Sequence, residues 1–327
     1  MIHGQNFAKN VKHARLVAIV DSDYENLQRA GNELGCDALY TDYKVAIDEN
    51  PDIDAIVVAT PTVLHWHIAT YAAERGKHIL CEKPMAMDLA ECVQMNEVVQ
   101  RNKVKFQIGF MRRFDKSFQA AMARVQAGEI GEVVQVKSLT HGPSVPRPWQ
   151  YDIAKSNGPL AEVNSHDIDT LRWFTGSEFK EVYALAGNFR CPEALPEFPD
   201  FYDNVSMLSS FDNGMQGFIG GAVSVNYGYD SRVEILGTKG ILFIGNLNEN
   251  TVLGCNRNGL TQSVISSWMY LYEAAYLAED RDFVECILED RKPVATGADG
   301  MMAVKVVNAG NRSILERRPV VLKTFEK

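Results

Sequence analysis

The first third of the chain alternates short apolar runs with segments of helical periodicity, and this alternation restricts the fold more than any other feature. Residues 14–20 and 55–59 are rich in small and β-branched apolar side chains, as expected of buried strands. Helical periodicity follows at Tyr24–Leu34, before Gly35. The pattern continues with helices over residues 65–75 and 88–101 and strands over residues 78–81 and 106–110. Strands joined through helices indicate right-handed βαβ units, so we expect a parallel sheet.

Polar residues and prolines stand where the expected strands end. Asp21, the pair Thr60-Pro61 and the sequence Glu82-Lys83-Pro84 each follow an apolar run directly. Ligands of parallel sheets bind outside the carboxyl ends of the strands. Dinucleotide-binding folds place an acidic residue at the position of Asp21, where it bonds ribose hydroxyls. The first third therefore predicts a site for a small ligand at one edge of the sheet.

A glycine-rich phosphate loop is missing from this pattern. An acid such as Asp21 normally follows G-x-G-x-x-G by about 20 residues, which would place the loop before Met1, and the chain contains no such motif elsewhere. Two interpretations stay open: a strand and loop precede the given start, or the protein has lost its cofactor. We favour the first, because the strands after the gap are intact. The missing strand would lie in the middle of the sheet.

The remainder of the chain has a different pattern. Short strand-like runs recur, some of them separated by turn residues such as Asp212-Asn213-Gly214, which favours hairpins. The expected strands cover residues 133–140, 181–185, 204–211, 215–222, 231–236 and 241–245. The expected helices cover residues 166–175, 268–288 and 297–316. We expect an α/β Rossmann-like parallel sheet over residues 1–111, followed by an α+β domain with a large, mostly antiparallel sheet over residues 112–327.

Charge and composition argue against several functions. A net charge of −9 disfavours nucleic acid and anionic membranes as partners, because phosphate contacts need clustered Lys and Arg. No apolar stretch approaches the length of a membrane span, and the start lacks the apolar centre of a signal peptide. The six cysteines form no CxxC pair, so we expect reduced thiols, no metal site and a cytoplasmic location.

Four motifs carry a resemblance to a known family. The sequences ATPTVLH (59–65), CEKP (81–84), GFMRRF (109–114) and EVNSHDID (162–169), in this order and spacing, resemble the Gfo/Idh/MocA family of NAD(P)-dependent oxidoreductases. YGYD (227–230) and VEILGTKG (233–240) look particularly like the inositol 2-dehydrogenases of that family. The resemblance covers nearly the whole chain. It implies a dinucleotide-binding domain over residues 1–111 and a domain for substrate binding and oligomerisation over residues 112–327, with assembly as a homodimer or homotetramer.

The resemblance implies hydride transfer between NAD, or NADP, and a secondary alcohol of a cyclic polyol or sugar. Lys83 stands at the mouth of a buried strand, where a cation acts more strongly than in water, and Pro84 keeps it out of helical dihedrals. A pKa near neutrality suits His166 as the general base. Glu162 is four residues away and orients His166 if one helix carries both. Without the resemblance, Lys83 would equally well be a strand-capping residue.

The family also implies the other residues of the site. The implied cofactor-binding residues are Asp21, Thr60, Pro61, His65, Glu82 and Lys83, and the implied substrate-binding residues are Arg113, Asn164, Tyr227 and Tyr229. Asp21 favours NAD over NADP, because a carboxylate there repels a 2′-phosphate. Arg113 could instead form an ion pair, and the tyrosines could pack on a sheet. The alternative function is a non-catalytic sugar sensor or scaffold on the same fold, which the missing glycine loop supports.

Overall fold

The computed structural model describes residues 1–325, and these residues form two compact units that alternate along the chain. The first unit consists of Met1–Ala86, Ala90–Phe114 and Glu273–Met301, and the second consists of Met87–Leu89, Asp115–Tyr272 and the chain from Met302 onward. A late segment of the chain, Glu273–Met301, thus packs with the N-terminal unit. The division at residues 111 and 112 as a functional boundary stays a prediction.

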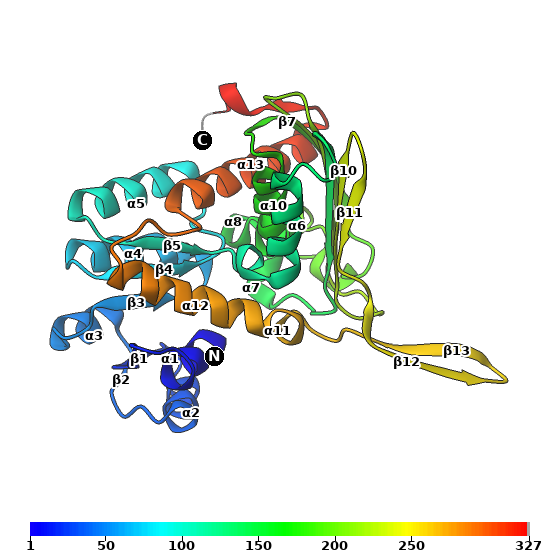
Figure 1. The fold of residues 1–327 in the computed structure, drawn as a ribbon. Helices are drawn as coiled ribbons and strands as arrows, with labels where there is room; N and C mark the ends of the chain where they lie inside the picture. Colours follow the sequence, from blue (N-terminus) through cyan, green and yellow to red (C-terminus); the bar gives the residue numbers. More distant parts are fainter. Residues whose placement is uncertain (326–327) are drawn as a thin grey trace. The chain divides into compact units, whose positions relative to one another are not determined.

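The parallel sheet of the first unit exists in two pieces (Figure 1). The strand β1 (Ile19–Val20) pairs in parallel with β2 (Leu39–Tyr40), and β3 (Ala55–Val58), β4 (His78–Glu82) and β5 (Phe106–Gly109) form a second parallel sheet. Within residues 1–325, β1 pairs only with β2, and β3 pairs only with β4. Both strands therefore have an open edge. Three of the four β3 residues are only half-buried, whereas we expected full coverage on both faces.

Helices of the first unit follow the expected pattern where local signals are strong. The helix α2 (Tyr24–Leu34) has exactly the expected bounds, because Asp23 caps its first turn and Gly35, at φ 66°, ends it. The other helices are α1 (Ile2–Lys9), α3 (Tyr43–Glu49), α4 (His65–Glu74), α5 (Leu89–Asn102) and α12 (Glu273–Leu288). The sequence analysis missed α1, whose buried residues are the polar His3 and Asn6. A helix without an apolar stripe lacks the signal that periodicity detects.

The second unit is built on a seven-stranded mixed sheet with the order β11-β10-β6-β9-β8-β7-β14. Its strands are β6 (Val133–His141), β7 (Phe179–Gly187), β8 (Asn204–Phe211), β9 (Gln216–Ala222), β10 (Asp230–Gly237), β11 (Ile241–Ile244) and β14 (Val320–Val321). Only β6 and β9 run parallel, so the expected mostly antiparallel sheet is confirmed. The turn at Asp212-Asn213-Gly214 joins β8 to β9 as a hairpin, also as expected.

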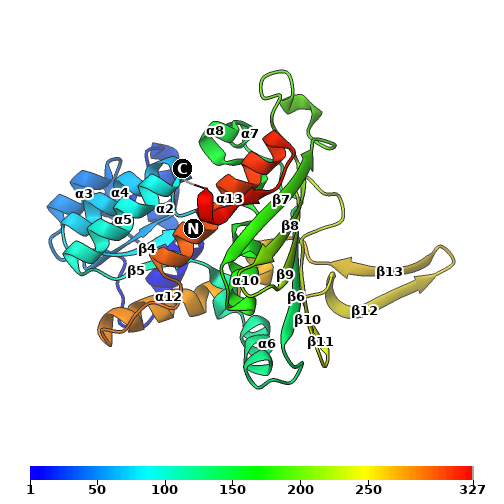
Figure 2. The same cartoon turned by 90° about the horizontal axis from the view of Figure 1, so that it is seen from above.

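Helices cover one face of this sheet (Figure 2). They are α6 (Lys116–Gln126), α10 (Ser165–Thr175) and the part of α13 (Gly297–Glu316) that begins at Met302. Three short helices, α7 (Pro148–Tyr151), α8 (Ile153–Ser156) and α9 (Gly158–Glu162), precede α10. The helix expected over residues 268–288 is in fact two, α11 (Trp268–Leu271) and α12, because the chain leaves helical geometry at Tyr272.

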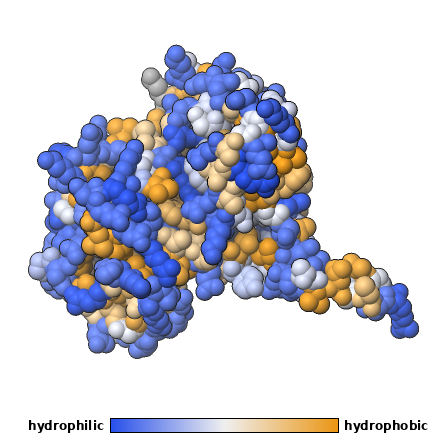
Figure 3. Space-filling view, in the orientation of Figure 1, coloured by the Kyte–Doolittle hydropathy of each residue, from blue (hydrophilic) through white to orange (hydrophobic). Residues whose placement is uncertain are grey.

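An arm formed by β12 (Asn248–Asn256) and β13 (Gly259–Val264) projects from the second unit. Every residue of β12 is exposed. Figure 3 shows hydrophobic residues along the arm and hydrophilic residues at its tip. The sequence analysis did not predict this hairpin, because strands exposed on both faces need no alternation of apolar and polar residues. None of the helices in residues 1–325 has both the length and the apolar character needed to cross a bilayer.

Candidate functional site

The structure places four of the expected cofactor-binding residues at the carboxyl ends of strands in the first unit. Asp21 follows β1 and is half-buried, and its Oδ1 accepts a hydrogen bond of 2.9 Å from the backbone N–H of Asp23. Thr60 and Pro61 follow β3 and are exposed. Glu82 is the last residue of β4. Parallel strands end at a common edge of a sheet, so these groups belong to the edge where ligands bind.

Glu82 is held at both of its carboxylate oxygens. Oε1 accepts a hydrogen bond from Nε2 of His3 at 2.9 Å, and Oε2 accepts one from the backbone N–H of Lys83 at 3.0 Å. Burial acts to raise the pKa of Glu82, but the hydrogen bond and charge of His3 outweigh it, so the pKa lies below its usual range. At Gly109, a Cβ would lie 3.0 Å from the carboxyl carbon of Glu82. A side chain there would push the carboxylate away.

Lys83 and His65 organise the loops that follow β3 and β4. Lys83 is half-buried and its peptide bond to Pro84 is cis. The imidazole of His65 is almost fully buried, with Nδ1 2.8 Å from the carbonyl oxygen of Pro84 and Nε2 2.8 Å from that of Thr60. We expected His65 to be a neighbour of the cofactor. In the structure its ring joins the two loops, so its effect on a ligand would be to position Thr60 and Lys83.

Arg113 forms the kind of ion pair that the sequence left open as an alternative to substrate binding. It lies in the 3-10 turn Met111–Phe114 and is buried. Its guanidinium donates to the carbonyl oxygen of Val294 at 2.8 Å and forms an ion pair of 3.1 Å with Asp299. These contacts connect the turn to the segment before α13 and to the first turn of that helix. Arg113 thus holds together parts of the first unit that are distant in sequence, and its expected contact with substrate stays a prediction.

In the second unit, His166 lies in the first turn of α10, which is anchored to the sheet by Asp167. The carboxylate of Asp167 is fully buried and accepts hydrogen bonds from Ser138 and Thr140 of β6 and from Asn164. The sequence analysis did not assign a role to Asp167, although it belongs to the quoted motif. Nothing in the sequence showed that β6 would present two hydroxyl groups to it.

Asn164, expected to bind substrate, is 0% exposed. Its amide group donates to Asp167 at 2.7 Å and to the carbonyl oxygen of Gly220 at 3.3 Å. These hydrogen bonds hold the side chain at the start of α10, and its expected role in substrate binding stays a prediction. Asn164 can influence His166 by holding that helix end in place.

Glu162 and His166 do not lie on one helix, which corrects the argument that they share a face. Glu162 is the last residue of α9, and α10 begins only at Ser165. The N–H groups of Val163 and Asn164 both bond to the carbonyl oxygen of Pro159, so the helix ends there. Glu162 accepts a hydrogen bond of 3.3 Å from Gln150. Its proposed support of His166 thus loses the spacing argument on which it rested.

Tyr227 takes part in a group of polar side chains, and its expected role in substrate binding stays a prediction. Its hydroxyl bonds to Nδ1 of His141 and to Asp230, and Arg232 forms an ion pair of 2.8 Å with the same carboxylate. Side chains alternate between the faces of a strand, so His141 points away from the face on which its neighbour Thr140 bonds to α10. Tyr227 therefore lies on the other face of the sheet from α10. Tyr229 is buried, and its N–H donates to Ile265 at 2.7 Å.

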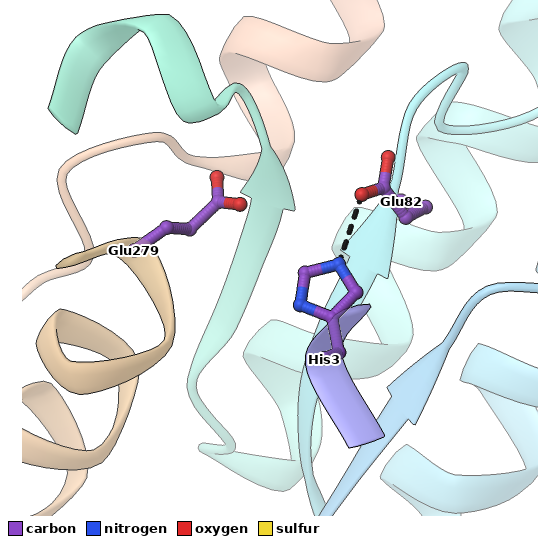
Figure 4. A group of neighbouring side chains, drawn as sticks. All are labelled: His3, Glu82 and Glu279. Atoms are coloured by element: carbon purple, nitrogen blue, oxygen red, sulfur yellow. Dashed lines mark hydrogen bonds and ion pairs between the residues drawn. The ribbon is translucent and has the colours of Figure 1, made fainter. Parts of the chain in front are cut away.

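A group of buried side chains in the first unit escaped the sequence analysis. His3 of α1, Glu82 of β4 and Glu279 of α12 point toward one another, as Figure 4 shows. One atom of each side chain that could bind a metal ion lies within 4.8 Å of the others. His3 also contacts Asp280, which is 277 residues away in the chain. No local sequence signal could have linked them.

The groups at the strand ends suit the ribose of a dinucleotide better than its pyrophosphate. A carboxylate at Asp21 provides acceptors for ribose hydroxyls, and Thr60 and Pro61 are exposed where the ligand would lie. The chain contains no G-x-G-x-x-G loop for a pyrophosphate. The parallel sheet with this edge, followed by a mixed sheet that carries a histidine in the first turn of a buried helix, defines a Rossmann-type protein with a second α+β unit.

Comparisons with known proteins identify the family. Residues 2–110 match the model of an oxidoreductase family with an NAD-binding Rossmann fold, and residues 118–243 match a GFO/IDH/MocA C-terminal domain. The chain is 32% identical to scyllo-inositol 2-dehydrogenase (NAD(+)) of Bacillus subtilis, across 98% of this chain and 92% of that protein. It is also 32% identical to myo-inositol 2-dehydrogenase of Thermotoga maritima, across 98% and 95%. The chain belongs to the Gfo/Idh/MocA family of oxidoreductases.

Solved structures agree with this assignment. Scyllo-inositol dehydrogenase of Lactobacillus casei with bound NAD(H) and scyllo-inositol superposes with a TM-score of 0.90 at 27% identity, covering 99% of this chain and 96% of that one. A myo-inositol dehydrogenase of Corynebacterium glutamicum superposes with a TM-score of 0.88 at 31% identity, covering 98% and 95%. The expected family, fold class and enzyme class, an NAD-binding oxidoreductase, are confirmed.

Proposed function

We propose that this protein is an NAD-dependent dehydrogenase that oxidises a secondary alcohol of a cyclic polyol of the inositol type. The observation that carries the proposal is the similarity to inositol 2-dehydrogenases along 98% of the chain, at 32% identity. The similarity extends through both units, and residues 118–243 of the second unit match a GFO/IDH/MocA C-terminal domain. A shared cofactor alone would explain similarity only in the Rossmann unit, so similarity in the second unit supports a shared class of substrate as well.

The proposed chemistry divides the removal of two hydrogens between two side chains and the cofactor. Bound NAD supplies the acceptor for the hydride from the carbinol carbon. The imidazole of His166 accepts the hydroxyl proton, and the ammonium of Lys83 stabilises the negative charge that develops on the oxygen. In the reverse direction His166 returns the proton. The proposal requires that both side chains flank one carbinol.

Cofactor choice follows from the group that ends β1. The carboxylate of Asp21 suits the two hydroxyls of an adenosine ribose and repels the 2′-phosphate of NADP. Thr60 and Pro61 supply an exposed surface at the neighbouring strand end. We therefore propose NAD as the physiological cofactor, with these residues and Glu82 at its binding edge.

The test is a panel of inositols and sugars assayed with NAD and with NADP by the absorbance of the reduced nicotinamide. It is run on this chain and on a chain extended at the N-terminus by a strand and a glycine loop. Lys83→Ala and His166→Ala should each lower kcat by about 10²–10⁴, the range typical of general acid–base groups. His67→Gln, at an exposed position of α4, is the control and should change little.

Two outcomes would count against the proposal. Near-normal turnover in either variant would remove the role given to that side chain. If neither form of the chain oxidises any polyol with either cofactor, although it still binds a polyol or sugar, the non-catalytic sensor becomes the better description.

We further propose that the protein assembles as a homodimer or homotetramer through the sheet of the second unit. Leu185, Leu208 and Phe243 are exposed hydrophobic residues on the face that lacks helices within residues 1–325. A groove of about 680 Å³, lined in part by Phe218 and Phe243, lies on this sheet near the base of the arm. Large apolar patches on a sheet favour burial against another surface.

We also propose a cytoplasmic location. Five of the six cysteines are buried thiols, which supports a reducing environment.

A further inference from the structure

A buried ion network joins α1, the end of β4 and α12 within the first unit. His3 is 6% exposed, with Nδ1 2.6 Å from Oδ1 of Asp280 and Nε2 2.9 Å from Oε1 of Glu82. The second contact is drawn in Figure 4. Asn6, one turn further along α1, donates to the other oxygen of Asp280 at 2.8 Å. Three segments that are distant in sequence thus meet at one imidazole.

The surroundings of His3 determine its charge. Both partners are carboxylates, which accept hydrogen bonds, so both ring nitrogens donate and the ring is an imidazolium. Burial alone would lower the pKa of His3, but the hydrogen bonds and charges of Asp280 and Glu82 raise it to about 10. The network therefore consists of one cation between two anions, and the ammonium of Lys83 adds a second positive charge near Glu82.

Glu279 completes the group as a neutral acid. It is fully buried, and neither of its carboxyl oxygens has a hydrogen-bond partner among residues 1–325. Burial and the nearby charge of Glu82 raise the pKa of Glu279 well above its usual range. The charged groups that face the network are therefore Glu82 and Lys83 at the end of β4 and Asp280 and Asp282 on α12, with Glu279 protonated beside them.

Glu82 connects His3 to the backbone of Lys83. One of its oxygens is bonded to His3 and the other to the N–H of Lys83, so a rotation of the carboxylate breaks at least one of these bonds. The absence of a side chain at Gly109 leaves just enough room for that orientation. The orientation of the backbone N–H of Lys83 therefore depends on the position of the His3 imidazole.

We propose that His3 is a positioning residue, which fixes the backbone at Lys83 through Glu82 and is itself held by Asp280 and Asn6. The proposal rests on the proposed function only where it gives Lys83 a role in turnover. The positioning itself is a property of the protein without ligand. The rival interpretation is a divalent cation bound by His3, Glu82 and Glu279, which would require the loss of a proton from both His3 and Glu279.

The experiment measures amide hydrogen exchange of the protein without cofactor, in a peptide that contains the N–H of Lys83. His3→Gln should accelerate exchange there at least ten-fold, and peptides of α4 should be unaffected. His67→Gln is the matched control and should leave both unchanged. His3→Gln leaves the carboxylates of Glu82 and Asp280 without their shared cation, and the double variant His3→Gln/Glu82→Gln removes one of these two charges, so it should recover part of the stability that His3→Gln loses.

A second measurement uses the unaltered protein and does not depend on any variant folding. Carbon-13 spectra of histidine-labelled protein should show the imidazolium form of His3 at neutral pH. A neutral ring at that pH overturns the proposal, and a change of its signal on addition of Zn²⁺ or Mn²⁺ would favour the rival cation site. If His3→Gln leaves hydrogen exchange at the N–H of Lys83 unchanged, the positioning proposal is overturned, even if the enzyme oxidises polyols. Faster exchange in a protein that turns over no polyol leaves the positioning intact and overturns the proposed function.

Discussion

Glu279 shows how strongly a single residue can depend on its surroundings. Its carboxyl group is fully buried, beside the carboxylate of Glu82 and without a hydrogen-bond partner in the described part of the chain. A charge there would lack both solvent and a counter-ion in contact, which is why its pKa is raised well above the usual range. The folded protein therefore retains a proton that the unfolded chain releases above a pKa of about 4.3.

Replacement of Glu279 by Gln tests this protonation state. A raised pKa in the folded state means that stability is greatest at low pH and falls as the pH rises above the value for the unfolded chain. Because Gln does not titrate, the stability of Glu279→Gln relative to the wild type should rise by up to about 1.4 kcal/mol for each pH unit above a pH of about 4.3. Urea unfolding at pH 5 and pH 8 measures the difference.

Glu33→Gln, at an exposed position of α2, is the control and should show no such dependence on pH. A loss of stability in Glu279→Gln that grows between pH 5 and pH 8 would mean that the carboxyl group is ionised in the folded protein. In that case a bound cation, and not a proton, would balance its charge.

At the scale of elements, the position of His166 depends on how α10 meets the sheet. Asp167 bonds to two hydroxyls of β6, and Asn164 donates to Asp167 and to the backbone of β9. Gly221 of β9 lies under this contact, where a Cβ would come 2.0 Å from Oδ1 of Asn164 and 2.8 Å from a methyl of Val205. The glycine therefore allows the start of the helix to approach the strand.

Gly221→Ala should destabilise the protein by about 1–3 kcal/mol, the usual cost of overpacking, and should lower activity by displacing the start of α10. Thermal unfolding and the polyol assay measure the two effects. Gly142→Ala is a matched control, because a Cβ at Gly142 meets nothing within 4 Å. Equal stability of the two variants would show that Asn164 can move aside without cost.

At the scale of the whole molecule, each unit depends on segments that are far apart in the chain. The segment Glu273–Met301 supplies Asp280 to His3 and Asp299 to Arg113, so the first unit lacks two of its buried ion pairs without it. A fragment that ends at residue 111 would leave His3 without one of its two carboxylate partners. The N-terminal unit is therefore defined by packing and not by a single cut in the sequence.

The open face of the second unit leads to a prediction about assembly. Phe243 is 68% exposed on that face and lines the groove near the arm. Phe243→Asp should convert a dimer or tetramer into a species near the monomer mass of 36.5 kDa, because an aspartate cannot be buried in an apolar interface without a partner. Light scattering after size-exclusion chromatography measures the mass.

Leu315→Asp is the matched control, since Leu315 is 78% exposed on α13, an element of the opposite face. It should leave the mass of the assembly unchanged. If Phe243→Asp keeps the same mass as the wild type, the exposed sheet is not the interface.

The sequence by itself determined the elements whose signals are local. Residues 24–34, 204–211 and 297–316 were placed with the bounds that the structure has, because caps, turns and periodic apolar residues act over a few positions. The alternation of strands and helices likewise indicated the parallel sheet and the edge at Asp21, Thr60 and Glu82. The motifs ATPTVLH (59–65), CEKP (81–84) and GFMRRF (109–114), together with EVNSHDID (162–169), indicated the family.

Only the tertiary structure decided which side chains meet. His3 contacts Asp280, which is 277 residues away, and Arg113 contacts Asp299, which is 186 residues away. A short break in the helix separates Glu162 from the helix that carries His166. Such contacts depend on how distant elements pack, and spacing along the chain carries no information about them. The physical reason is that burial makes an ionised side chain costly unless it is paired, so packing selects partners for buried charges wherever they lie in the sequence.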